Sequence, residues 1–194
     1  PTRADFNLFE DEKFAYNFEE GRLNVAEVKD SKLDYVLVPF SVHGFRITSF
    51  CPSKKVGGSY DKLYLGSNVE SVGENTVYLS SNFSSLREIN VDPANKFLTA
   101  YKNVLYNIGN DAPYFIPSAI TKLELKPVKV IEKNFIYHLE NVEEIVFAEG
   151  TERIEAYAIE KCRNLRKVYV PSSVTYMDKD AIYDCGNDVE IIRK

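Results

Sequence analysis

The chain has 194 residues, a length that suits one ordinary domain or a short array of stacked repeats. Hydrophobic residues make up 44% of it and charged residues 27%, which excludes a disordered or fibrous class. A net charge of -5, without a run of basic residues, argues against nucleic acid as a partner. No apolar stretch reaches the roughly 18 residues of a membrane-spanning helix.

The N-terminal region predicts two β-hairpins. Residues 14–28 alternate between apolar and polar positions on both sides of Gly21, as expected for two strands joined by a tight turn. Because the end of a stack of repeats exposes unpaired backbone groups, we expect residues 1–34 to form a tail and a capping hairpin. A second hairpin signal lies in residues 39–50, with its turn at His43–Gly44.

Residues 35–194 contain a repeat of about 23 residues, which is clearest near the C-terminus. Ile145–Asn164 and Val168–Asn187 align without a gap, and each apolar position of one segment is apolar in the other. Segments of the form L-x-x-L-x-L begin at Leu86 and Leu165 and lead into their units. Such self-similarity indicates structural repeats that stack on one another.

Two further copies are recognisable, and an irregular insert separates them. Leu63–Asn82 aligns with the last full unit without gaps, whereas Lys122–Asn141 needs one deletion. Residues 91–121 interrupt the period and predict an insert with a small hairpin around Asn103. The aromatic and apolar stretch 114–121 predicts a truncated strand turn, and its register stays open.

Each unit predicts a strand followed by a return. The L-x-L segment alternates with the period of a strand, and the apolar spacing after it fits a short turn or helix. One unit cannot bury its own apolar face, so neighbouring strands must lie side by side at about 4.8 Å. We therefore predict a short right-handed solenoid, mainly β or α/β, that forms a single domain over residues 1–194.

The repeat residues resemble the BspA-type leucine-rich-repeat family. VYVPSSVTYMDKDAIYDCGN, at Val168–Asn187, is similar to the family unit V-x-I-P-S-S-V-T-x-I-G-x-x-A-F-x-x-C-x-x-L. NKFLTAYKNVLYN resembles a variant repeat of the family, and FAYNFEEGRLNVAEV followed by SVHGFRITSF resembles its N-terminal entry. The chain departs from the unit at Asp178, where Gly is usual, at Ile159 and Ile182, where Phe is commoner, and at Ser80, where Cys is usual.

The resemblance implies a leucine-rich-repeat solenoid from a secreted or surface-attached bacterial protein, or from a surface protein of certain protists. It also implies adhesion to an extracellular or cell-surface protein of a host or another bacterium. Because the sequence begins with Pro1 rather than Met, we expect an export signal or anchor to lie outside it. We therefore expect a non-catalytic recognition or adhesion module, with a structural spacer or self-assembly domain as the alternative.

Residues suited to chemistry are few and scattered. His43 and His138 stand alone and predict structural or exposed side chains. Cys162 and Cys185 share one repeat position and predict small apolar core side chains. A disulfide between them requires Cα atoms within about 7 Å, and that alternative stays open. The spacing of the cysteines does not suit zinc, and we expect neither a metal nor a cofactor.

An enzyme is the third alternative. Glu124 and Glu144 fall on adjacent predicted strands, as the carboxylate pair of a glycosidase would. On an open sheet face both carboxylates are well solvated, so a raised pKa for a general acid is not expected there.

The outward positions of the strands predict the binding site. In L-x-x-L-x-L the third and fifth side chains point away from the core, so stacking places them together on one exposed, concave sheet. Tyrosines, charges of both signs and an exposed valine suit protein recognition, although a merely solvated face is the alternative. The predicted ligand-binding residues are Lys62, Tyr64, Glu88, Asn90, Glu124, Glu144, Val146, Lys167 and Tyr169.

Overall fold

The computed structural model describes residues 9–10, 13–19, 21–29, 34–52, 60–73 and 83–194. The chain divides into two compact units: unit 1 comprises residues 1–108 and 114–117, and unit 2 comprises residues 109–113 and 118–194. The described parts of both units contain strands and turns and no helix. Accordingly, no described helix could cross a membrane. That both units act as a single domain stays a prediction.

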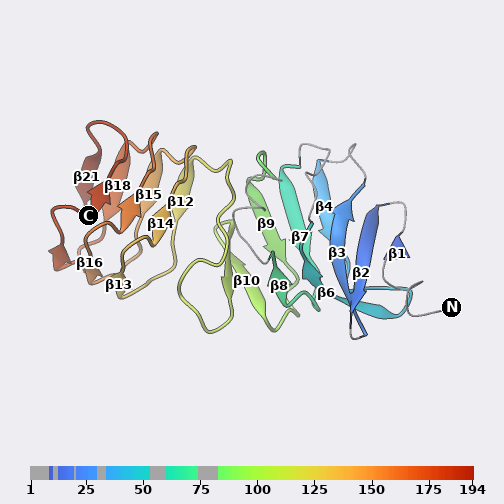
Figure 1. The fold of residues 1–194 in the computed structure, drawn as a ribbon. Coiled ribbons are helices and arrows are strands. Elements are labelled where there is room, and N and C mark those ends of the chain that lie inside the picture. Colours follow the sequence, from blue (N-terminus) through green and yellow to red (C-terminus); the bar gives the residue numbers. More distant parts are fainter. Residues whose placement is uncertain (1–8, 11–12, 20, 30–33, 53–59, 74–82) are drawn as a thin grey trace. The chain divides into compact units, whose positions relative to one another are not determined.

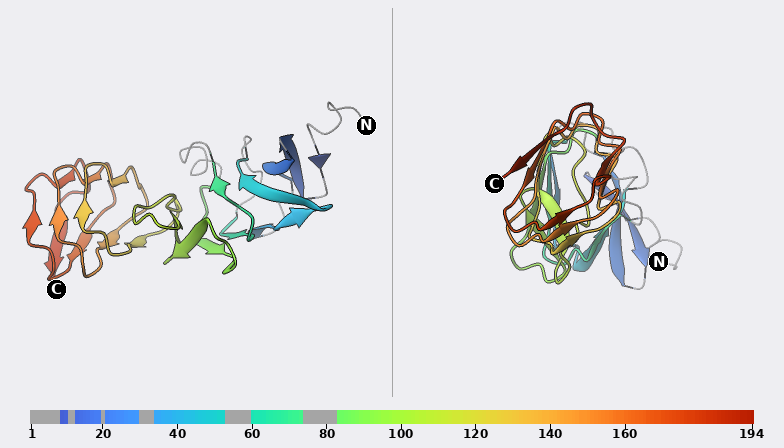
Figure 2. Two further views of the ribbon diagram at one scale, coloured as in Figure 1. Left: turned by 90° about the horizontal axis from the view of Figure 1, so that it is seen from below. Right: turned by 90° about the vertical axis from the view of Figure 1, so that its left-hand side faces the viewer.

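Unit 2 is a stack of coils with three short strands in each full coil (Figures 1 and 2). The first strands form one parallel sheet of β12 (Lys122–Glu124), β15 (Glu144–Val146), β18 (Lys167–Val170) and β21 (Glu190–Arg193). The second strands form another, of β13 (Val130–Ile131), β16 (Arg153–Ile154) and β19 (Tyr176–Met177). The third strands form a sheet of β14 (Ile136–Tyr137), β17 (Ile159–Glu160) and β20 (Ile182–Tyr183).

The strand register of unit 2 confirms the predicted repeat. Ile145 pairs with Val168 and Ile154 pairs with Met177, as the alignment of the last two full units requires. Ile131 pairs with Ile154, which confirms the alignment of the preceding unit with one deletion. The paired apolar side chains form ladders in the interior, where residues such as Ile145 and Ile154 are fully buried. Burial of each such side chain stabilises the stack by about 1.5–3 kcal/mol.

The return of each coil in unit 2 consists of two short strands and left-handed corners. A short turn or a helix was predicted there, and none of the described returns contains a helix. His138, Lys161 and Asp184 occupy the same position in successive coils, with φ of 56°, 58° and 49°. Asn134 and Tyr157 form another such corner, with φ of 58° and 59°. A right-handed helix requires negative φ throughout, so these corners end any helical turn.

Unit 1 contains a mixed sheet, a parallel sheet and a separate hairpin. The mixed sheet is made of β1 (Phe9–Glu10), β2 (Phe14–Glu19), β3 (Arg22–Val28), β5 (Ser41–Val42), β6 (Phe45–Phe50) and β8 (Ser71–Val72). The parallel sheet is made of β4 (Tyr35–Val38), β7 (Lys62–Leu65) and β9 (Glu88–Val91). The hairpin is made of β10 (Leu98–Tyr101) and β11 (Val104–Asn107).

All three predicted hairpins are present, and their turns have the expected backbone conformation. The turn between β2 and β3 has Gly21 at φ of 80°. The β5–β6 turn has His43 and Gly44 at 47° and 84°, and the β10–β11 turn has Lys102 and Asn103 at 49° and 67°. Two successive residues with positive φ match the right-handed twist of the strands that they join. The role of the first hairpin as a cap stays a prediction.

The register of residues 114–117, at the end of the predicted insert, follows from their pairing with β11. Phe115 pairs with Leu105 of β11, and Tyr114 N donates a hydrogen bond of 2.7 Å to Leu105 O. Residues 114–117 therefore belong to unit 1, and the chain continues toward β12 in unit 2. Most of the predicted tail in residues 1–12, and the part of the predicted copy that contains Ser80, lie outside the described residues.

The core of unit 1 contains several aromatic side chains. Tyr16, Phe50, Tyr60, Phe83 and Tyr106 are among its largest fully buried residues. Ring centroids of Phe50 and Phe83 lie 5.6 Å apart, and those of Tyr60 and Phe83 lie 6.0 Å apart. Such contacts add about 0.5–1.5 kcal/mol each beyond the burial of surface, and they hold together a unit whose strands do not follow one regular repeat.

Candidate binding faces

Each unit exposes one side of a parallel sheet. The unit 1 outer face consists of the outward residues of β4, β7 and β9, namely Tyr35, Leu37, Lys62, Tyr64, Glu88 and Asn90. The unit 2 outer face consists of the outward residues of β12, β15, β18 and β21, namely Lys122, Glu124, Glu144, Val146, Lys167, Tyr169, Glu190 and Ile192. The structure places all nine predicted residues at outward positions, but on two separate sheets rather than the one sheet that was predicted, four in unit 1 and five in unit 2.

The unit 1 outer face carries an apolar cluster of Tyr35, Leu37 and Tyr64. Leu37 lies opposite Tyr64 in the neighbouring strand, and the Tyr35 and Tyr64 rings meet edge to face with centroids 6.0 Å apart. Tyr35 is 42% exposed and Leu37 is 53% exposed. The cluster thus presents aromatic and aliphatic surface to solvent from a framework of paired strands.

Polar groups border this apolar cluster and satisfy one another. Lys62 Nζ lies 3.3 Å from Glu88 Oε2, and Asn90 Nδ2 donates a 2.7 Å hydrogen bond to Glu88 Oε1. The hydrogen bond from Asn90, with that from Lys62, holds the pKa of Glu88 below its usual value. The same Glu88 carboxylate raises the pKa of Lys62. Both groups are therefore charged near neutral pH, and the carboxylate is not suited to act as a general acid.

A small pocket adjoins the apolar cluster. It has a volume of about 20 Å³ and is lined by Lys13, Phe14, Val28, Tyr35, Val36, Leu37 and Tyr60. Sites for drug-sized molecules occupy about 300–1,000 Å³, so this pocket accommodates only a group the size of a side-chain tip. Its lining is predominantly apolar, which suits a small aliphatic group.

Tyr35 and Leu37 were missing from the predicted binding residues, because the first clear copy of the repeat begins at Leu63. A sequence signal for them exists: YVLVP, at residues 35–39, has the same x-V-x-V-P form as KVYVP at residues 167–171. That match identifies β4 as the first strand of a coil and places Tyr35 and Leu37 at outward positions.

The unit 2 outer face is balanced in charge along one row. Lys122, Glu144, Lys167 and Glu190 lie opposite one another in successive strands, so their charges alternate. The second row consists of Glu124, Val146, Tyr169 and Ile192. Within it, the Glu124 carboxylate lies 3.4 Å from Lys122 Nζ, and Lys194 Nζ lies 4.6 Å from the Tyr169 ring centroid. Lys122, Glu124 and the Tyr169 ring therefore already have partners within unit 2.

The two glutamates of the glycosidase alternative do not face each other. Glu124 lies opposite Val146, whereas Glu144 lies opposite Lys122 on one side and Lys167 on the other. Both glutamates stand on the half-exposed outer side of the sheet. A retaining or inverting glycosidase needs two carboxylates that flank a bound sugar, whereas these two are offset along the strands and each lies beside a lysine.

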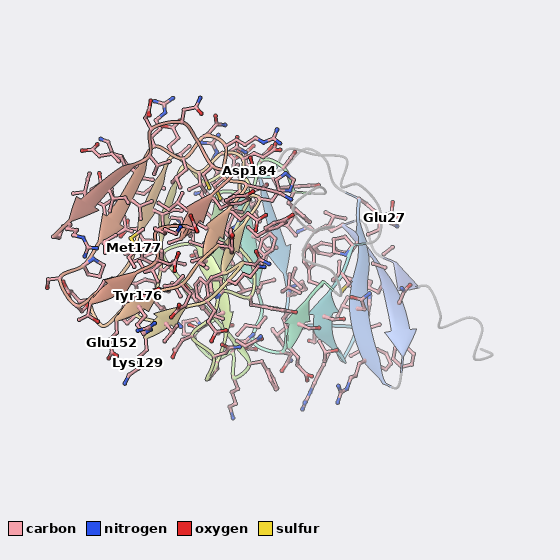
Figure 3. All side chains as sticks on the ribbon, turned by 60° about the vertical axis from the view of Figure 1, so that its left-hand side comes forward. Glu27, Lys129, Glu152, Tyr176, Met177 and Asp184 are labelled. Atoms are coloured by element: carbon pink, nitrogen blue, oxygen red, sulfur yellow. The ribbon has the colours of Figure 1, made fainter. Side chains whose placement is uncertain are left out.

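The return strands of unit 2 also carry polar side chains that pair with one another (Figure 3). Lys129 Nζ lies 3.8 Å from the Glu152 carboxylate, and the Arg153 guanidinium lies 4.3 Å from the Tyr176 ring centroid. Tyr176 Oη donates a 2.9 Å hydrogen bond to Asp178. A backbone hydrogen bond from Asp180, together with that from Tyr176, lowers the pKa of Asp178. These side chains therefore already have partners within unit 2.

The histidines and cysteines lie apart from both outer faces. His43 and His138 are exposed at turns, and His138 Nε2 lies 3.2 Å from Glu140 Oε1. Cys162 is buried as predicted, whereas Cys185 is only partly buried, because its coil has a paired neighbour on one side only among the described strands. Both thiols are free. The described residues contain no group of three or more potential ligands arranged for a metal ion.

Several solved structures resemble the chain at low sequence identity. The pneumococcal vaccine antigen PcpA is 14% identical, with a TM-score of 0.47 over 89% of this chain and 57% of that one. A leucine-rich cell surface protein of Faecalibacterium prausnitzii is 18% identical, with a TM-score of 0.35 over 76% and 51%. A leucine-rich-repeat protein of Bacteroides capillosus is 12% identical, with a TM-score of 0.37 over 97% and 99%. The chain thus spans little more than half the length of the first two.

The family assignment comes from the repeat itself. No curated protein matches the sequence. A sequence profile described as the BspA-type leucine-rich-repeat region matches residues 59–188 in six copies, which is more than half of the chain. The match includes the coils whose register confirms the repeat. The chain therefore belongs to the BspA-type leucine-rich-repeat family.

Proposed function

We propose that this chain is a non-catalytic recognition module that binds a protein through the unit 1 outer face. The observation that carries the proposal is the exposed apolar cluster of Tyr35, Leu37 and Tyr64. Exposed apolar side chains that form a contiguous patch are typical of interaction sites, and aromatic residues commonly anchor them. The polar groups of Lys62, Glu88 and Asn90 beside the cluster match the polar rim of such interfaces.

The strand framework favours tight recognition by this cluster. β4, β7 and β9 pair over their whole length, so the backbone that carries the three side chains is fixed before a partner arrives. Tyrosine has few rotatable bonds and loses little conformational entropy on binding. The edge-to-face contact between Tyr35 and Tyr64 restricts both rings further. Pre-organisation of this kind increases affinity without additional contact area.

We propose an extracellular or cell-surface protein as the partner, in keeping with the repeat family. The small apolar pocket beside Tyr35 and Leu37 favours a protein with a protruding aliphatic side chain over a small-molecule ligand. The mutual neutralisation of Lys62 and Glu88 argues against a strongly charged partner, because neither group is left to pair with it. The surface or extracellular location and the adhesive role are parts of the same proposal.

A defined binding panel tests the proposed function. Purified extracellular-matrix, plasma and bacterial surface proteins are immobilised, and the chain is compared with its Leu37→Asp and Val146→Asp variants. Leu37→Asp places a charge in the apolar cluster, whereas Val146→Asp makes the same change on the unit 2 outer face. We expect saturable binding that Leu37→Asp abolishes and Val146→Asp preserves. Absence of saturable binding to every member, or equal loss in both variants, contradicts the proposal.

A structural spacer or self-assembly domain is the second candidate. It is favoured by the alternating charges of Lys122, Glu144, Lys167 and Glu190, which need no partner, and by the exposed Ile191 of β21. Light scattering over a wide range of protein concentration separates the candidates. A mass that rises with concentration and falls to that of the monomer on Ile191→Asp supports self-assembly, and a constant monomer mass contradicts it.

A further inference from the structure

Two cysteines lie at equivalent corners of consecutive coils in unit 2. β17 and β20 pair in parallel, with Glu160 opposite Tyr183, and Cys162 and Cys185 follow each strand by two residues. Beyond this pairing, Gly186 N donates a 3.1 Å hydrogen bond to Cys162 O. The two backbones are therefore held together on both sides of the cysteines. Adjacent strands lie about 4.8 Å apart, within the roughly 4.4–6.8 Å that separates Cα atoms of disulfide-linked cysteines.

Both thiols point toward the same strand. Cys162 Sγ lies 3.6 Å from Glu160 O of β17. Cys185 Sγ lies 3.6 Å from Ile159 O, the preceding carbonyl of β17, and 3.3 Å from Tyr183 O of its own strand. The two thiols are close enough to perturb each other's pKa. This convergence follows from the left-handed corners at Lys161 and Asp184, which turn both cysteine side chains in the same way. Figure 3 labels Asp184 at the second of these corners.

The two cysteines differ in access and in acidity. Cys162 is fully buried, whereas Cys185 is partly exposed. The hydrogen bond from Cys162 lowers the pKa of the Cys185 thiol to about 7. The same bond, together with burial, raises the pKa of Cys162. Because the thiolate is the reactive form, Cys185 is suited to attack an oxidant that arrives from solvent. The buried Cys162 is then suited to attack the mixed disulfide that forms at Cys185.

We propose that Cys162 and Cys185 form a redox-modification site that reacts with a low-molecular-weight disulfide to link consecutive coils. The Cys185 thiolate attacks one sulfur of the oxidant, whose S–S bond breaks and releases one thiolate, which takes up a proton. The Cys162 thiol then loses its proton and attacks Cys185 Sγ in the mixed disulfide, which releases the second thiol of the oxidant. Two protein thiols are thereby oxidised to one disulfide, and the oxidant is reduced to two thiols.

This site is independent of the proposed binding function, because it lies on the return side of unit 2 and not on an outer face. A disulfide here closes a loop of one coil and restricts the unfolded chain more than the folded one. Its physical effect is to fasten the coil that contains β18, β19 and β20 to the coil before it. In an oxidising extracellular environment the coils would persist in the linked form.

The test treats the reduced full chain with oxidised glutathione under native conditions. Intact mass and peptide mapping follow the products, and circular dichroism gives the melting temperature. We expect the mass to fall by two hydrogens, a peptide that links Cys162 to Cys185, and a rise in Tm of about 5 °C or more. Cys51→Ser serves as the matched control, since it removes the third thiol, in unit 1, and should leave all three results unchanged.

A second variant identifies the attacking thiol. In Cys162→Ser we expect glutathione to remain attached to Cys185, because the thiol that resolves the mixed disulfide is absent. Since a buried serine can itself weaken the fold, the wild-type linkage decides the proposal. Wild-type protein that stays unreacted while folded, that stops at the mixed disulfide, or that links either cysteine to Cys51 overturns it. An oxidised form with a Tm below that of the reduced form overturns the fastening role.

Discussion

The outer faces of the two units have the same strand pairing but different outward side chains. On the unit 2 outer face, one row alternates lysine and glutamate from Lys122 to Glu190. On the unit 1 outer face, Tyr35, Leu37 and Tyr64 leave apolar surface exposed. The interior rows of both sheets must be apolar for the coils to stack, whereas the outward rows are not constrained by stacking. Recognition can therefore be confined to some coils while others only support them.

The units also differ in how their coils are held. Apolar ladders in regular register stabilise the coils of unit 2. In unit 1, a buried asparagine side chain stabilises the coils where the repeat is interrupted. The Asn95 side-chain amide donates 2.9 Å hydrogen bonds to Gly66 O and Val69 O. Its side-chain oxygen accepts 2.8 Å hydrogen bonds from Phe97 N and Leu98 N. One residue thus satisfies four backbone groups at the start of the insert.

Among the substitutions that test this difference between the units, Asn95→Ala should change the stability most. The substitution leaves buried backbone groups without partners, and we expect it to lower the free energy of unfolding by about 2–4 kcal/mol. Chemical denaturation measures this change. Asn68→Ala is the control, because Asn68 is more exposed and donates one 2.9 Å hydrogen bond to Phe40 O. A loss for Asn95→Ala no larger than that for Asn68→Ala would contradict the proposed role of Asn95.

The next largest effect is expected at Gly66, where unit 1 needs a glycine and the aligned position of unit 2 holds Pro171. A Cβ atom at Gly66 would lie 2.8 Å from Phe40 N and from Pro39 C of the preceding coil. We expect Gly66→Ala to lower the free energy of unfolding by about 1–3 kcal/mol, since rigid backbone must move apart. Ser67→Ala, next to it, should change this value by less than about 0.5 kcal/mol. Equal effects at both positions would show that the coils of unit 1 are not closely apposed there.

A smaller effect, of opposite sign, is expected in unit 2. The Thr151 side-chain hydroxyl is buried and has no hydrogen-bond partner among the described residues. Thr151→Val keeps the shape and removes that hydroxyl, so we expect the free energy of unfolding to rise by up to about 1 kcal/mol. Thr175→Val is the control, because Thr175 Oγ1 donates a 3.2 Å hydrogen bond to Glu152 O and its loss should be mildly destabilising. A drop in stability for Thr151→Val would indicate that the hydroxyl has a bound partner, such as water.

The smallest effect concerns the Glu88 carboxylate on the unit 1 outer face. Asn90 and Lys62 lower its pKa in the folded chain, so its contribution to stability is present above the unfolded pKa and is lost as the pH falls through the folded one. For a partly exposed pair we expect only a few tenths of a kcal/mol. Glu88→Gln should therefore be slightly less stable than the wild type at pH 7, and the difference should disappear as the pH falls through the folded-state pKa of Glu88. Denaturation over a series of acid pH values measures this, and a difference that does not change with pH would contradict it.

Much of the fold could be predicted from the sequence, because the interior of a solenoid repeats visibly along the chain. The period fixed the pairing of Ile145 with Val168, and the short turns at Gly21 and Asn103 predicted their hairpins. The form of the return was not decided, because a few apolar positions fit a turn as well as a helix. Its left-handed corners depend on the backbone of the neighbouring coils, which residue spacing does not reveal.

The candidate site was predicted less completely. The outward positions from Lys62 onward follow from strand alternation, and the structure places them as expected. Tyr35 and Leu37 were missed, because their strand precedes the first clear copy of the repeat. The partial exposure of Cys185 was also missed, since burial depends on whether another coil covers a residue and not on its place within the repeat. Sequence patterns thus identify faces more readily than they rank residues within a face.

The central claim is that a partner binds the unit 1 outer face, and a comparison of two matched variants tests it most directly. Isothermal titration measures the Kd of a partner from the binding panel for Tyr35→Ala/Leu37→Ala/Tyr64→Ala and for Val146→Ala/Tyr169→Ala/Ile192→Ala, after both variants are shown to melt cooperatively. We predict that the affinity for the partner falls by about 100-fold or more in the first variant and by less than about threefold in the second. An equal loss for both variants, or a larger loss for the second, would contradict the claim.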